Sequence, residues 1–292
     1  MLVVAHQAPV IAHRCPVNAR TISTRLATIA TVAAAIAAAA GVFVGGLYRD
    51  TPYWIEQARG TDLATLFVAV PVLATGLWAM RRGSESAWLV VIAGLLYLAY
   101  NYAIFAFSVA MNPLTSLYIA IAGFATWSLL AGAMDGATVS AGQVVAERLA
   151  RRTSAVVLVG VALLFTLLWL GQLGGSVASG TVPPDIARAG IPTNPVYALD
   201  LAFFLPLVAV AGLGLLRRGR AGAYAFTMLI WVPLMSAGIL GGFVLAAAAG
   251  GEVPLPVVAV VGGVGAVSAM AAVVPVVRRS TVEPRTASRA VA

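Results

Sequence analysis

The stretch LLYLAYNYAIFAF, residues 95–107, places polar groups inside an otherwise apolar segment. At 100° per residue of an α-helix, one face collects four side chains that could contact a ligand: Tyr97, Tyr100, Asn101 and Phe105. An unpaired amide in hydrocarbon costs several kcal/mol, so this face is expected to look into a helix bundle. It then either lines a pocket for a lipid head group, a quinone or another small amphiphile, or it holds an interhelical hydrogen bond from Asn101 worth about 0.6–2 kcal/mol.

Two carboxyl groups, Asp62 and Asp200, open two other apolar segments, each within the tripeptide Asp-Leu-Ala. They could face a shared cavity and there bind a cation or carry protons. The alternative role is helix capping, because an Asp in the first turn accepts hydrogen bonds from free backbone N–H groups and complements the positive end of the helix dipole. The two roles are compatible.

The side chains that most enzymes use are missing from the apolar segments. The chain has no lysine, and its two histidines and single cysteine, His6, His13 and Cys15, all lie near the N-terminus. This distribution excludes a Ser–His–Asp triad, a Walker-type phosphate loop and a cluster of histidine or cysteine metal ligands within those segments. No catalytic residue, metal site or cofactor is therefore expected, and the protein is not expected to be an enzyme.

The composition indicates that transmembrane helices position the candidate residues. Of the 292 residues, 61% are hydrophobic and 10% are charged, and the mean hydropathy is +0.97. A soluble domain contains roughly 25% charged residues. Crossing a bilayer as a helix takes about 17–25 apolar residues. Eight apolar runs approach or reach this length, and they occupy residues 26–48, 63–80, 87–110, 114–132, 154–173, 201–216, 221–248 and 254–277. An all-α polytopic transmembrane bundle of about eight spans is expected, the sixth span beginning nearer Tyr197.

The arginines predict the orientation of this bundle. With the N-terminus in the cytoplasm, 15 of the 18 arginines lie in cytoplasmic segments, and only Arg49, Arg59 and Arg188 lie outside. By the positive-inside rule, both termini are then cytoplasmic. The start of the chain also has the outline of a signal peptide, but its apolar run continues unbroken to Tyr48, which favours an uncleaved first span.

Two similar segments predict an internal repeat. TDLATLFVAVPVLATGLWAMRRGS and LDLAFFLPLVAVAGLGLLRRGR share an Asp-Leu-Ala start, a mid-span proline (Pro71, Pro206) and an Arg-Arg-Gly end. Two halves of four spans are expected, and because four is even, they are parallel, related by an axis along the membrane normal. The expected organisation is a cytoplasmic tail at 1–25, the first half at 26–134, a cytoplasmic linker at 135–152, the second half at 153–277 and a cytoplasmic tail at 278–292.

The halves are not expected to be equivalent. At an offset of 136 residues, Pro233, Ser236 and Ala237 stand where the first half has Tyr97, Tyr100 and Asn101. If there is one ligand site, it is therefore expected on the side of the first half.

The segments NPVYALDLAFFLPL…LLRRGR and GLLYLAYNYAIFAF resemble stretches of uncharacterised bacterial polytopic membrane proteins of about eight spans, to which no activity is assigned. The resemblance implies a multi-pass protein of a bacterial-type plasma (inner) membrane. It carries over no catalytic or binding residue.

Two connections also carry predictions. Residues 140–152 are expected to form either a short amphipathic helix on the membrane surface, with Val144, Val145 and Leu149 toward lipid, or a solvated linker. The connection 174–194 is rich in glycine and proline and is expected to be irregular.

Three functions fit these features. The leading hypothesis is binding or moving a small amphiphile or lipid in an outward-facing cavity between the halves, lined by the six candidate residues. The second is a non-catalytic accessory or scaffold subunit of a membrane complex, and the third is an outward-facing membrane enzyme that uses Asp and Arg. The expected partners are the lipid bilayer, a small amphiphile or lipid ligand, and a second copy or another membrane protein. No nucleic-acid binding is expected, because the basic charge is spread between apolar runs rather than gathered on a soluble module.

Overall fold

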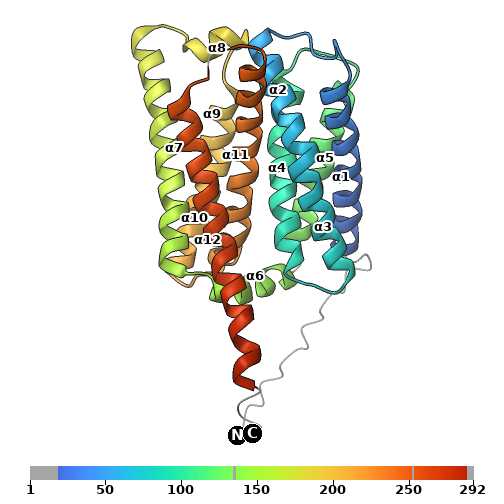
Figure 1. Cartoon of the computed structure of the whole chain (residues 1–292), viewed down its shortest axis with the longest axis vertical. Helices are drawn as coiled ribbons and strands as arrows, with labels where there is room; N and C mark the ends of the chain where they lie inside the picture. Colours follow the sequence, from blue (N-terminus) through green and yellow to red (C-terminus); the bar gives the residue numbers. More distant parts are fainter. Residues whose placement is uncertain (1–18, 134–135, 252, 288–292) are drawn as a thin grey trace, which may run out of the picture.

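Figure 1 shows a computed structural model of the chain, which is a bundle of long helices. The structure describes residues 19–133, 136–251 and 253–287, and these form helices and loops without any strand. Six of the spans contain one long helix each: α1 (Ala19–Phe43), α4 (Ala87–Ser108), α5 (Thr115–Ala133), α7 (Arg151–Ser179), α11 (Ala225–Ala248), which follows the short 3₁₀-helix η3 (Arg220–Tyr224), and α12 (Leu255–Ala287). The second span consists of α2 (Pro52–Ala64), η1 (Thr65–Ala69) and α3 (Val70–Arg81) in succession. The sixth consists of α9 (Pro195–Leu199), η2 (Asp200–Phe204) and α10 (Leu205–Leu216).

These helices confirm the predicted all-α bundle with eight candidate membrane spans among the described residues. The two remaining helices, α6 (Gly136–Arg148) and α8 (Pro184–Ala189), lie at opposite ends of the bundle (Figure 1). We call these ends the α6 end and the α8 end. Because the number of spans is even, α1 begins and α12 ends on the same side, and both do so at the α6 end.

The outside of the bundle is apolar. Phe67, Trp127, Leu167 and Val244 are each more than half exposed on four different spans. A soluble monomer rarely exposes contiguous apolar surface on this scale, whereas lipid tails solvate it without cost. The exposed surface therefore indicates an integral membrane protein in contact with the lipid bilayer.

Small side chains bring α1 and α5 close together. Along α1, Ala30, Ala34 and Ala37 are fully buried and recur at helical spacing. Near the α6 end, Ser23 Oγ donates to Ser128 O at 2.6 Å, and Ser128 Oγ donates back to Ser23 O at 2.7 Å. Without competing water, such hydrogen bonds help to hold membrane helices in register.

A close helix crossing joins the two predicted halves. A Cβ atom added to Gly60 of α2 would lie 2.0 Å from the backbone nitrogen of Gly242 on α11, and one added to Gly241 would lie 2.4 Å from Gly60 O. Glycine is therefore required at this crossing, where backbone meets backbone as in other small-residue contacts between membrane helices. The glycines of the seventh span at this crossing thus pack inside the subunit.

The second and sixth spans share a local distortion. In each, a π-helical segment ends just before a proline, at Pro71 and at Pro206, and the backbone bonds Val70 N to Thr65 O and Leu205 N to Asp200 O span five residues. Proline cannot donate to the preceding turn and its ring crowds that turn, so the helix widens ahead of it. The two spans also begin alike, with the caps Thr51 and Asn194 each followed by a proline. The internal repeat itself stays a prediction.

Two expectations for the connections need correction. Residues 136–148 form α6, but Val145 and Leu149 are buried against protein rather than turned to lipid, because η3 and α11 pack against this helix. Only Val144 of the three apolar residues is exposed. The connection 174–194 is largely helical, since α7 continues to Ser179 and α8 follows at 184–189.

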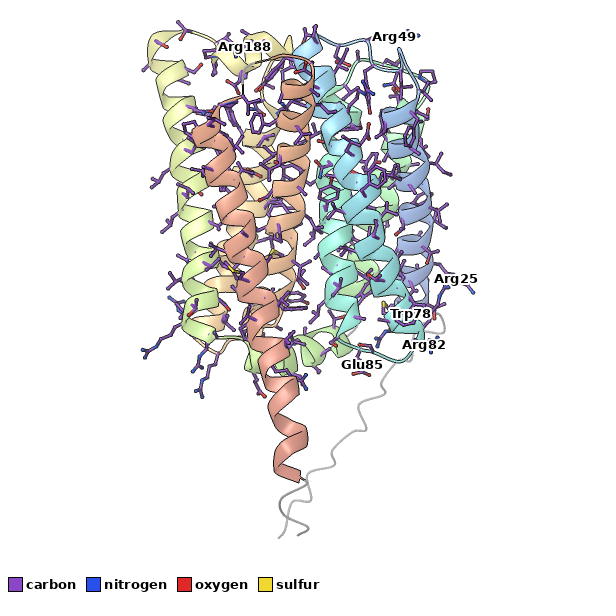
Figure 2. All side chains as sticks on the ribbon, in the orientation of Figure 1. Arg25, Arg49, Trp78, Arg82, Glu85 and Arg188 are labelled. Carbon is purple, nitrogen blue, oxygen red and sulfur yellow. The ribbon has the colours of Figure 1, made fainter. Side chains whose placement is uncertain are left out.

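Figure 2 shows how the labelled arginines are distributed. Arg25 and Arg82 lie at the α6 end, and Arg49 and Arg188 lie at the α8 end. Arg82 stacks over the Trp78 ring at 4.9 Å from its centroid. Which face of the membrane each end meets stays a prediction.

Candidate functional site

A cavity of about 220 Å³ lies inside the bundle, toward the α8 end. Residues from both predicted halves line it, contributed by α2, α4, α7, α8, α9, η2, α10, α11 and α12. Its outer part is bounded by Tyr53, Trp54 and Asp185, and it reaches inward as far as Val161 and Trp231. It therefore runs from the loops at the α8 end toward the middle of the bundle.

Three of the four residues predicted on the α4 face line this cavity: Tyr100, Asn101 and Phe105. Asn101 is 8% exposed, and its Nδ2 donates to Tyr97 O at 2.9 Å and to the Met235 sulfur on α11 at 3.6 Å. Among the described residues, no hydrogen bond is donated to its Oδ1. The contact with Met235 is the interhelical bond that was the alternative to a ligand site, but a thioether is a weak acceptor. Asn101 thus combines a weak link between helices with a place on the cavity wall.

An aromatic cluster supports Tyr100. Its ring meets Phe204 edge-on at 4.8 Å between centroids, and Phe204 stacks on Trp231 at 5.1 Å. These geometries are the favourable ones for aromatic pairs and add stability beyond buried area. The cluster ties α4 to η2 and α11 and fixes the wall of the cavity between them.

Asp200 also lines the cavity, from the start of η2. It is 8% exposed, its Oδ2 accepts a hydrogen bond from Trp169 Nε1 at 2.7 Å, and the Tyr100 hydroxyl lies against the same carboxyl group. One turn away, the Tyr197 hydroxyl donates to Gln172 Oε1. Trp169 of α7 therefore orients the carboxyl group of Asp200 at the wall.

Asp62, by contrast, lies outside the cavity. It is 1% exposed and accepts a hydrogen bond from the Tyr48 hydroxyl, in a tight contact that also includes Gly41 of α1. Burial, and then the neighbouring Asp62, raise the pKa of Tyr48 above its ordinary value, so its hydroxyl remains a donor at neutral pH. The expectation that Asp62 and Asp200 face one shared cavity is not met by this arrangement.

Tyr97 is the other predicted residue that the structure places elsewhere. It is fully buried, and its hydroxyl lies 3.0 Å from Thr65 Oγ1 and 3.3 Å from Thr61 O. It joins α4 to the second span at η1, in a packed region. Four of the six predicted residues thus surround one cavity, and Asp62 and Tyr97 do not.

Neither aspartate caps a helix. The second span begins ten residues before Asp62, at Pro52, and the sixth begins at Pro195, where Thr51 and Asn194 serve as the caps. The capping interpretation is therefore wrong, because both spans start earlier than hydropathy alone suggested.

Several lining residues were not predicted. Trp169 and Trp231 come from the second half, and Gln57 comes from the start of the second span. A signal existed for Trp169, because an indole N–H inside an apolar span needs an acceptor. The short helix α8 lines part of the cavity with Ile186 and Ala189. Its sequence, in a stretch rich in glycine and proline, did not predict a helix.

Comparison of the chain with protein-family models, curated proteins and solved structures finds no match. The function of the cavity therefore has to be inferred from its own residues.

Proposed function

We propose that the protein binds or moves a small amphiphile, or the head group of a lipid, in the cavity at the α8 end. The observation that carries the proposal is the shared wall made by Tyr100, Asn101 and Phe105 from one half and Asp200 from the other. A mostly apolar, aromatic wall with a few convergent polar groups is typical of sites for small molecules. In the proposed setting, a bacterial-type plasma membrane with both termini in the cytoplasm, this cavity opens outward.

The volume limits the ligand. An apolar cavity of about 150 Å³ holds one benzene molecule in another protein. A volume of about 220 Å³ accommodates a head group or a ring with a short substituent, but not a whole diacyl lipid. A lipid would therefore enter with its polar end only.

The direct test is to fill the cavity with a larger side chain and to measure whether the bound molecule is lost. Val264 of α12 lines the cavity, whereas Val267, three residues further along, is 45% exposed on the outside of the bundle. The purified wild type should carry a co-purifying small amphiphile or lipid that native mass spectrometry detects. Val264→Phe should lose it, and Val267→Phe, the matched control, should retain it.

Two results would count against the proposal. One is an identical set of bound molecules in the wild type and in Val264→Phe, with both proteins folded. The other is a wild type without any bound molecule but with a constant protein partner, which would favour an accessory subunit.

A further inference from the structure

The charged residues that line the cavity are all acidic, and Arg188 of α8, which acts electrostatically on the lining residue Tyr53, is not among them. Among its lining residues, all of which lie in the described part of the chain, Asp185 and Asp200 are acidic and none is basic. This is unusual in a chain with a formal net charge of +8 and 18 arginines. A cavity lined by one sign of charge and walled by low-dielectric material concentrates the opposite charge.

The carboxyl group of Asp200 has no basic partner among the described residues. Its neighbours are neutral donors, the Trp169 indole at 2.7 Å and the Tyr100 hydroxyl. Such donors stabilise and orient a carboxylate, but they do not balance its charge. An ionised group inside the membrane is costly unless an opposite charge reaches it. The site therefore favours a cation that arrives with the ligand.

The walls suit a soft organic cation. Seven of the lining residues are aromatic: Tyr53, Trp54, Tyr100, Phe105, Phe165, Trp169 and Trp231. Aromatic faces attract ammonium groups within roughly 6 Å, and quaternary ammonium groups are recognised in this way. A metal ion would need several oxygen ligands, and no group of three carboxylate, histidine or cysteine side chains occurs in the described residues.

We infer that the cavity selects a positively charged amphiphile, whose organic ammonium group lies against Asp200 between aromatic side chains. This inference rests on the proposed function and names its ligand class. Asn101 lies on the same wall, and its Oδ1, which accepts no hydrogen bond from the described residues, provides an acceptor for a polar group next to the cation.

The test compares two probes of the same shape and different charge. Phenyltrimethylammonium is the cation, and tert-butylbenzene is its neutral counterpart. The full-length protein in nanodiscs provides the readout, because Trp54, Trp169 and Trp231 line the cavity and report binding by fluorescence. After correction for partition into the lipid, the wild type should bind the cation at least about tenfold more tightly than the neutral probe.

Matched variants assign this preference to one residue. Asp200→Asn should remove the preference while leaving the affinity for tert-butylbenzene within about twofold of the wild type. Asp200→Glu keeps the charge and should keep the preference, so the test remains valid if Asp200→Asn folds poorly. Glu56→Gln removes an acid from the same end of the bundle that does not line the cavity, and it should behave like the wild type.

The outcomes separate the inference from the proposed function. Equal or tighter binding of the neutral probe overturns the cationic class but leaves a ligand cavity in place. An unchanged preference for the cation in Asp200→Asn overturns the placement of the ammonium group against Asp200. Binding of neither probe also contradicts the inference, and the co-purification result for Val264→Phe then decides independently whether the cavity binds any ligand.

A competition experiment distinguishes two sources of the same chemistry. Displacement of phenyltrimethylammonium by dihexanoylphosphatidylcholine, but not by dihexanoylphosphatidylglycerol, supports a lipid head group as the natural cation. Displacement by free quaternary ammonium compounds alone supports a soluble amphiphile.

Discussion

A buried carboxyl group in a membrane bundle depends on the few donors around it. The Tyr48 hydroxyl is the hydrogen-bond donor to Asp62, whose Oδ1 has no partner among the described residues. Removing the donor would leave both carboxyl oxygens buried and without hydrogen bonds. The free-energy penalty of such unsatisfied groups exceeds the net stabilisation that one average hydrogen bond provides.

Tyr48→Phe is therefore expected to destabilise the protein by about 1–3 kcal/mol, measured as a lower thermal unfolding temperature in detergent. Tyr224→Phe is the control, because the hydroxyl of Tyr224 makes no hydrogen bond with any described residue. Equal stability of the two variants would mean that Asp62 does not depend on Tyr48.

Asn101→Leu separates the two roles of that residue. Its bonds go to a carbonyl of its own helix and to a thioether, so the free energy of unfolding should change by no more than about 1 kcal/mol. Binding of a cationic amphiphile that carries a hydrogen-bond donor next to its ammonium group should weaken, because the acceptor leaves the wall. A variant that loses thermal stability but binds normally would instead identify Asn101 as a purely structural link.

The helical period of α4 was sufficient to predict that Tyr100, Asn101 and Phe105 share an inward face. It was not sufficient to predict which neighbour each residue meets. Tyr97 lies on that face but reaches the second span, because a helix side about 100° wide contacts more than one partner. For the same reason, the similar contexts of Asp62 and Asp200 in the sequence did not reveal that one faces Tyr48 and the other Trp169.

Among the elements, the crossing of α2 and α11 leaves no room for a side chain at Gly60. Gly60→Ala should lower thermal stability strongly and reduce the yield of folded protein, since its Cβ would overlap the backbone of Gly242. Gly123→Ala on α5 is the matched control, because a Cβ there meets no atom within 4 Å. If both variants melt at the temperature of the wild type, the crossing is looser than the structure indicates.

The spans were predictable because length and hydropathy determine them, whereas their ends depended on local chemistry. The first span ends at Phe43, five residues before the predicted end, where Gly45 and Gly46 follow and Gly46 adopts a positive φ of 74°. The π-helical segments had a visible cause in Pro71 and Pro206, but a proline alone does not show whether a helix kinks or widens.

At the scale of the whole molecule, the even number of spans and the arginine distribution together predict one topology, with both termini in the cytoplasm. Cys15 is the single cysteine, so it already serves as a label for the N-terminal side. In intact cells, a membrane-impermeant maleimide should leave Cys15 unmodified and should label it after the membrane is opened.

The control moves the single cysteine to the other end of the bundle. Val182, between α7 and α8, is 61% exposed. In a Cys15→Ser background, Val182→Cys should react in intact cells. Labelling of Cys15 in intact cells, with Val182→Cys protected, would reverse the orientation and make the cavity open to the cytoplasm.

The glycine crossing brings two backbones together on one side of the cavity. Gln57 and Gly238, which line the cavity, lie within one turn of Gly60 and Gly241, where the backbones of α2 and α11 already touch. On the opposite side, smaller shares of the most apolar stretches of α12 and α7 are buried, 22% and 28%, compared with 33% for the second span and 44% for the span that contains α11. A ligand would therefore enter and leave by displacing α7, α8 or α12, so that a covalent link between α7 and α12 should slow exchange, while a link between α2 and α11 should not.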